Sequence, residues 1–73
     1  MESFDIDGHT ATGFHLEQQF KGNYCLQATV DGRNRKYIIR KGTPEHDAIT
    51  KTGLANLSEE TRKTLIERYC MDN

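Results

Sequence analysis

The chain has little of what marks a secreted or membrane protein. Its 73 residues include only two cysteines, Cys25 and Cys70, which lie too far apart to form a metal-type pair. No stretch approaches about 20 consecutive apolar residues, the length of a membrane span. The acidic start, residues 1–5, lacks the basic and apolar regions of a signal peptide. We therefore expect a cytoplasmic protein in which both thiols stay reduced and at least half-buried.

Apolar residues are also scarce. Hydrophobic residues make up 34% of the sequence and charged residues 29%, and the mean hydropathy is −0.82. Such a chain forms one domain, residues 1–73, with a core near the smallest that folds alone. This predicts self-association or a partner that covers part of the surface. It also leaves little room for a deep, dry cleft, so we expect no enzyme active site.

Three segments alternate apolar and polar residues with the period of a β-strand. They span residues 12–20, 24–30 and 35–41. Residues 12–41 are therefore predicted to form an antiparallel β-meander with one apolar face. Residues 1–11, where Phe4 and Ile6 alternate with acidic residues, form either an N-terminal arm or a short fourth strand at the edge. Such an arm could also pair with a neighbour's edge strand and produce a homodimer.

The first hairpin turn fixes a predicted register. Residues 21–23 contain Gly and Asn, which suit the positive φ angles of a three-residue loop. That loop places Phe20 opposite Tyr24 and Leu16 opposite Ala28. Phe20 is thus predicted to lie on the apolar face of the sheet.

The second hairpin turn contains Asp31-Gly32, a strong short-range hairpin signal. A two-residue loop there pairs Leu26 with Tyr37, whereas a four-residue loop pairs Ala28 with Tyr37. Both registers place Tyr37 on the same face as the apolar residues of the middle strand.

Two helices are predicted within residues 43–72. Thr43 and Pro44 suit a helix N-terminus, and this short helix ends near Gly53, although its few apolar residues also fit an ordered loop. Ser58 begins a longer, amphipathic helix. The apolar residues of this part are Leu54 and Leu57 between the helices and Leu65, Ile66, Tyr69 and Cys70 along the second one. The predicted fold class is α+β: a three-stranded antiparallel meander, with a possible short N-terminal fourth strand, and one short and one longer C-terminal helix packed on one face.

No cluster of reactive or ligating residues is evident. His9, His15 and His46 lack the spacing of metal ligands, so we expect dispersed surface histidines, no metal and no cofactor. By alternation Cys25 falls on the outer sheet face, whereas Cys70 lies on the core stripe of the last helix. A Cys–His nucleophile pair could be assembled only by the fold, and Cys25 is then the more accessible thiol. No glycine-rich turn or helix N-terminus stands beside it to supply an oxyanion site, which argues against an enzyme.

Charge is unevenly distributed along the chain. Residues 1–20 carry a net charge of −4, residues 21–42 carry +5 and residues 43–73 carry −2. Five of the ten Lys and Arg residues lie in one hairpin, residues 33–41. Its basic residues are Arg33 at the hairpin tip, Arg35, Lys36, Arg40 and Lys41.

Part of this charge projects from the outer sheet face. By alternation Lys36 and Arg40 lie there beside Gln27, and Cys25 with Ile38 forms a small apolar centre. Three interpretations fit this surface. It is a solvated edge strand that uses Lys and Arg against edge-to-edge pairing, a docking face for another protein, or a nucleic-acid contact.

Two resemblances bear on this choice. The element order of residues 12–70, a meander with a helix behind it, resembles the AP2-type and integrase-arm DNA-binding modules, which implies a nucleic-acid partner. Against that, Tyr24 and Tyr37 point inward, so no exposed aromatic side chain is expected to stack on bases. In size and character the chain resembles phage-encoded inhibitors such as anti-CRISPR proteins, which implies a protein partner.

We therefore predict a small non-enzymatic protein-binding module, an inhibitor or an adaptor, that acts through the polar outer sheet face. The alternative is a nucleic-acid-binding module that uses the basic hairpin 33–41. The residues predicted to contact the partner are Gln27, Arg33, Arg35, Lys36, Ile38 and Arg40.

Overall fold

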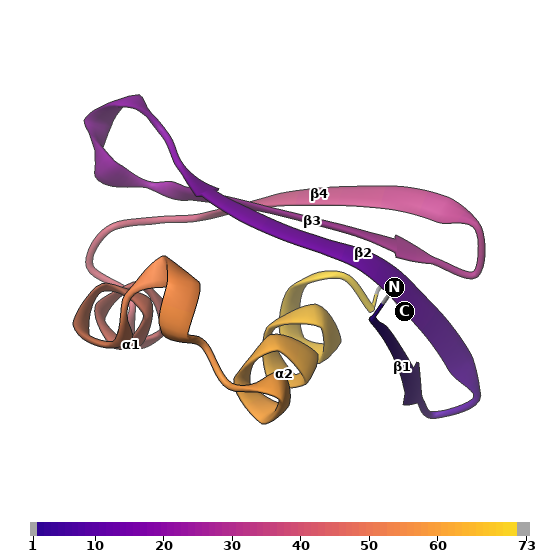
Figure 1. Ribbon diagram of the computed structural model, residues 1–73. Helices are drawn as coiled ribbons and strands as arrows, with labels where there is room; N and C mark the ends of the chain where they lie inside the picture. Colours follow the sequence, from indigo (N-terminus) through magenta and orange to yellow (C-terminus); the bar gives the residue numbers. More distant parts are fainter. Residues whose placement is uncertain (1, 72–73) are drawn as a thin grey trace.

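The computed structural model describes residues 2–71, which form a four-stranded antiparallel sheet and two α-helices (Figure 1). The strands are β1 (Ser3–Ile6), β2 (His9–Gln18), β3 (Tyr24–Val30) and β4 (Arg33–Ile39). The helices are α1 (Pro44–Thr52) and α2 (Glu59–Tyr69), with short 3-10 turns η1 (Phe20–Gly22) before β3 and η2 (Leu54–Asn56) before α2. Both helices lie on one side of the sheet, so the predicted α+β architecture is confirmed.

The strands follow one another across the sheet in chain order, β1-β2-β3-β4. The N-terminal segment is the fourth strand of this meander and not a loose arm, because Phe4 and Ile6 are buried in the core. Glu2 fastens the start of β1 to α2: its carboxylate accepts hydrogen bonds from Arg62, one of them 2.9 Å long. These bonds lower the pKa of the Glu2 carboxyl below its ordinary value.

The β3–β4 hairpin has the two-residue loop, so the four-residue alternative is excluded. Leu26 lies opposite Tyr37 in the ladder. Asp31 and Gly32 have φ angles of 51° and 82°. These are the left-handed values that both positions of such a turn require, and they match the twist of the flanking strands.

The β2–β3 register differs from the prediction. Tyr24 lies opposite Gln18 and not opposite Phe20. The connection spans residues 19–23 in place of 21–23, because η1 occupies its middle and Phe20 has left the sheet. A shift of the pairing by two residues leaves each paired side chain on the same face. The sheet therefore still has one apolar and one polar face.

A β-bulge in β2 keeps the apolar side chains of both halves of the strand on the core side of the sheet. The register with β3 shifts between Thr12 and His15, where Gly13 has a φ of 66° that glycine adopts without strain. An uninterrupted alternation would place Ala11 and Leu16 on opposite faces. The extra residue lets both of them pack on the core side.

Both helices begin at the predicted residues. The Thr43 hydroxyl oxygen accepts a hydrogen bond of 3.2 Å from the His46 backbone N–H, and Pro44 occupies the first helical position. The Ser58 hydroxyl oxygen accepts one of 3.1 Å from the Thr61 N–H at the start of α2. The segment after Thr43 is therefore a capped helix and not an ordered loop.

The core lies between the helices and the inner face of the sheet. Its buried residues are Phe4, Ile6, Ala11, Tyr24, Leu26, Ala28, Val30, Ile39, Ile49, Leu57, Leu65, Ile66 and Cys70. Leu57, which precedes α2 in the sequence, is buried in this core, whereas Leu54 lies in η2 and is 40% exposed. A hydrogen bond of 2.8 Å between the Tyr24 and Thr50 hydroxyls links β3 to α1.

Candidate functional site

The outer face of the sheet is turned away from both helices (Figure 1). The register assigns its side chains to three rows across β2, β3 and β4. These rows are Thr12, Thr29 and Asn34; His15, Gln27 and Lys36; and Glu17, Cys25 and Ile38. All but two of these side chains are polar or charged, so this face is built to meet water or a partly polar partner.

The outer face contains one exposed large apolar side chain, Ile38 on the edge strand β4, which is 38% exposed. Its neighbour Cys25 is only 2% exposed, which corrects the prediction of an accessible thiol. By the register Cys25 points outward, in an inner strand between Glu17 and Ile38, and its short side chain is nevertheless buried. The predicted apolar centre formed by Cys25 and Ile38 is therefore reduced to a single exposed side chain, Ile38, at the edge of this face.

The six residues predicted to contact a partner do not form one patch. Gln27, Lys36 and Ile38 share the outer face, and the exposed Arg40 continues the same alternation just beyond the end of β4. The other two, Arg33 and Arg35, lie opposite Val30 and Ala28, which face the core.

This separation follows from the period of two in a strand, since odd and even positions of β4 face opposite sides. The basic hairpin 33–41 is thus divided between both faces of the sheet. Its charges therefore do not form one continuous basic surface.

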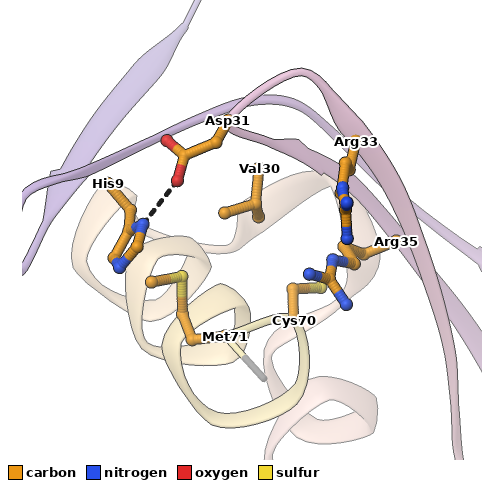
Figure 2. Close-up of a pocket in the computed structure, with 7 residues that line it drawn as sticks. All are labelled: His9, Val30, Asp31, Arg33, Arg35, Cys70 and Met71. Atoms are coloured by element: carbon orange, nitrogen blue, oxygen red, sulfur yellow. Dashed lines mark hydrogen bonds and ion pairs between the residues drawn. The ribbon is translucent and has the colours of Figure 1, made fainter. Parts of the chain in front are cut away.

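Arg33 and Arg35 line a cavity of about 220 Å³ on the helix side (Figure 2). The end of α2 closes it with Cys70 and Met71. Burial raises the pKa of the Cys70 thiol to about 11, and the nearby positive charge of Arg35 opposes this only in part. At neutral pH the thiol is therefore protonated and a poor nucleophile.

The opposite wall of this cavity contains the Asp31 carboxylate, which faces His9 (Figure 2). The Asp31 carboxylate accepts a hydrogen bond of 2.5 Å from His9 Nδ1 and another of 3.0 Å from the Thr10 N–H. These bonds, that of His9 first, lower the pKa of the Asp31 carboxyl. They join the β3–β4 turn to the start of β2.

The three histidines have different environments, and one of them was predicted wrongly. His9 and His15 are exposed, as expected, and His15 lies 3.7 Å from a Glu17 carboxylate oxygen. His46 is buried in the first turn of α1 and stacks on Tyr24, with ring centroids 4.6 Å apart. Within residues 2–71 no three His, Cys, Asp or Glu side chains come together as metal ligands.

The functional candidate that the sequence did not reveal is Phe20. It lies in the connection formed by residues 19–23, termed the β2–β3 tip, and is 90% exposed. The imidazole Nε2 of His46 donates a hydrogen bond of 2.6 Å to the Gly22 carbonyl oxygen and holds this tip against α1. In the sequence, Gly22 and Asn23 predict a turn but not its length. The contact with His46 could not be predicted, because His46 is distant in the sequence.

No protein-family model, curated protein or solved structure matches this chain significantly. No helix of the described part of the chain is long and apolar enough to cross a bilayer. The surfaces available for inferring a function are therefore the outer face and the β2–β3 tip.

Proposed function

We propose that this protein is a non-enzymatic binding module whose outer sheet face docks on another protein. The observation that carries the proposal is the position of the two helices, which cover the inner face and leave the outer one bare (Figure 1). The exposed Ile38 lies on this face, on the edge strand β4. An apolar residue surrounded by polar ones is the usual arrangement at a non-obligate interface, with an apolar contact inside a polar rim.

The charges around Ile38 indicate the chemistry of the partner. Lys36 and Arg40 stand two positions to either side of it, so the strand period places both beside Ile38. Among residues 2–71 neither side chain takes part in an ion pair. A partner that presents carboxylates around a shallow apolar spot would satisfy both cations, and its charge would increase the association rate.

The proposed mode of action is occupancy of the partner's surface, as in an inhibitor or an adaptor. Cys25 is covered and the Cys70 thiol is protonated at neutral pH, so neither supplies an activated nucleophile. The division of the basic hairpin between two faces also disfavours the alternative in which residues 33–41 bind nucleic acid as one surface.

The proposal is tested by charge reversal on the outer face. Tagged wild type, the double variant Lys36→Glu/Arg40→Glu and a control, Lys51→Glu/Lys63→Glu on the helices, are used to capture proteins from a lysate of the source organism. We expect one protein to be captured by wild type and the control and lost at least tenfold with the outer-face variant. Ile38→Asp should produce the same loss, with circular dichroism and thermal unfolding showing that each variant is folded.

The result that contradicts the proposal is equal capture by wild type and the outer-face variants. A protein lost equally with the helix control would show a general charge effect. Either outcome excludes the outer face as the docking surface.

A further inference from the structure

The β2–β3 tip presents an aromatic ring to solvent in a chain that has few apolar residues to spare. Phe20 is 90% exposed, whereas the next most exposed large apolar side chains, Leu54 and Ile38, are 40% and 38% exposed. Burying a Phe side chain stabilises a protein by about 1.5–3 kcal/mol. The fold lacks this stabilisation at Phe20. Such an exposed ring is expected of a residue that contacts a ligand.

The tip that presents Phe20 is held in place by hydrogen bonds on both sides of the ring. The Gln19 N–H donates to the Asn23 carbonyl oxygen at 2.7 Å, and the Gly22 N–H donates to the Gln19 carbonyl oxygen at 3.0 Å. Outside the tip, His46 binds the Gly22 carbonyl oxygen at 2.6 Å, and the Lys41 N–H donates to the Asn23 side-chain oxygen at 3.0 Å. A loop whose backbone is held in this way presents its side chain to a ligand without the entropic cost of ordering a mobile loop.

Two lysines accompany the ring. Lys21 is its direct neighbour in the chain, and the Lys41 side chain lies across Gly22, so close that a Cβ at this glycine would stand 3.0 Å from the Lys41 Cδ. In the described part of the chain neither ammonium group forms an ion pair. The other residues around Phe20 in sequence are polar or glycine: Gln18, Gln19, Gly22 and Asn23.

We propose that Phe20, Lys21 and Lys41 form a contact site for single-stranded nucleic acid. An unpaired base stacks on the Phe20 ring, and the adjacent phosphates lie against the two ammonium groups. A duplex lacks this option because its bases already stack on one another.

This site is separate from the outer face and does not depend on the protein partner proposed for it. The expected strength follows from its small size. One base stacked on an aromatic side chain contributes roughly 1–3 kcal/mol. Two phosphate contacts on a single strand give a slope of about −1.4 for log affinity against log salt concentration, so that binding weakens about sevenfold between 50 and 200 mM salt.

Phe20→Trp turns the proposed contact into a fluorescence reporter, since the chain has no tryptophan of its own. Titration with a short oligothymidine should quench this Trp and show the salt dependence given above. Leu54→Trp is the matched control, an exposed apolar position in η2 at which the oligonucleotide should produce no quenching. The same sequence annealed into a duplex should bind more weakly than the single strand.

Two further variants separate the stacking from the charge, with anisotropy of a labelled oligothymidine as the measurement. Phe20→Ala should weaken binding about 5- to 150-fold. Lys21→Glu/Lys41→Glu should abolish the salt dependence and most of the affinity. Lys51→Glu/Lys63→Glu, which reverses two distant charges, should bind as wild type.

Four results would overturn the site. The first is no quenching of the Trp at position 20 at low salt, and the second is equal quenching of the Trp at position 54. The third is a blue shift of the Trp at position 20 with vesicles of phosphatidylcholine and phosphatidylserine, without a response to oligothymidine, which would assign the ring to a membrane surface. Loss of the captured protein with Phe20→Ala, again without oligonucleotide binding, would assign it to the protein interface.

Discussion

Two of the three hairpin tips, those of β2–β3 and β3–β4, lie at opposite ends of the sheet and are built in different ways (Figure 1). The β3–β4 tip is a two-residue turn, Asp31-Gly32, whose left-handed φ angles are those that its own residues favour. The β2–β3 tip, residues 19–23, contains Lys21 at a φ of 77°, a value that a lysine rarely adopts. It is held there by His46 from a helix. One tip follows from local preference and the other is imposed by tertiary contacts.

The two tips also differ in what they present to solvent. The β3–β4 tip uses its carboxylate internally, on His9 and Thr10. The β2–β3 tip uses a buried imidazole internally and displays Phe20. A loop that is costly to form and shows its largest apolar side chain to water suggests selection for contact and not for stability.

The largest effect is expected where the β2–β3 tip is attached. His46→Ala removes the hydrogen bond to the Gly22 carbonyl and the contact with the Tyr24 ring, and should lower the free energy of unfolding by about 2–3 kcal/mol. The exposed His15→Ala should change it by less than about 0.5 kcal/mol. Urea denaturation measures both, and similar values for the two variants would show that the tip does not depend on His46.

At the β3–β4 tip, stability depends on the backbone conformation of the turn. Gly32 has a φ of 82°, and a Cβ there would meet no atom within 4 Å. Gly32→Ala should therefore cost only the strain of the left-handed conformation, about 1–2 kcal/mol in urea denaturation. A neutral result would mean that the turn changes type without penalty.

At Lys21 the substitution should increase the free energy of unfolding, the opposite of the effect expected at Gly32. Lys21→Gly relieves the left-handed strain but adds entropy to the unfolded chain, for a net stabilisation of about 0.5–1 kcal/mol. Lys51→Gly, in the last turn of α1, should destabilise by about 1 kcal/mol. A loss of stability with Lys21→Gly would contradict the assignment of strain to this tip.

A smaller, pH-dependent effect is expected at Asp31, which lies at the surface. The pKa of its carboxyl is lowered from 3.8 in the folded state, so its contribution is present above that value and is lost as the pH falls through the folded pKa. Asp31→Asn retains a residue that tolerates a positive φ but carries no charge. We expect the variant to be less stable than wild type at neutral pH and the difference to shrink below about pH 4. A difference independent of pH would exclude the His9–Asp31 contact as its source.

The structure was predictable from the sequence wherever it depends on residues that are close together in the chain. The Asp31-Gly32 turn, the Thr43 and Ser58 caps and the inward face of β3 all follow from alternation and local hydrogen bonding. The β2–β3 register was not predictable in this way. Its loop length depends on His46, a residue of α1 that reaches back to the Gly22 carbonyl.

The candidate site was predictable in part. Alternation correctly placed Gln27, Lys36 and Ile38 on the outer face. The same alternation applied to Arg33 and Arg35 places them on the helix side. A count of basic residues along the hairpin therefore overstates the charge that lies on one face of the sheet. The exposure of a side chain was harder to predict than its direction, since it depends on the size of neighbours in adjacent strands. Cys25, which points outward and yet is covered, is the example.

The most direct test of the contrast between the tips is the stability of Phe20→Ala. If Phe20 is displayed for contact and contributes nothing to the core, the free energy of unfolding in urea should stay within about 0.5 kcal/mol of wild type. Phe4→Ala, at a buried position, should lose about 3–5 kcal/mol in the same experiment. A loss of that size for Phe20→Ala would contradict the account, because it would mean that the ring is packed inside the protein in solution.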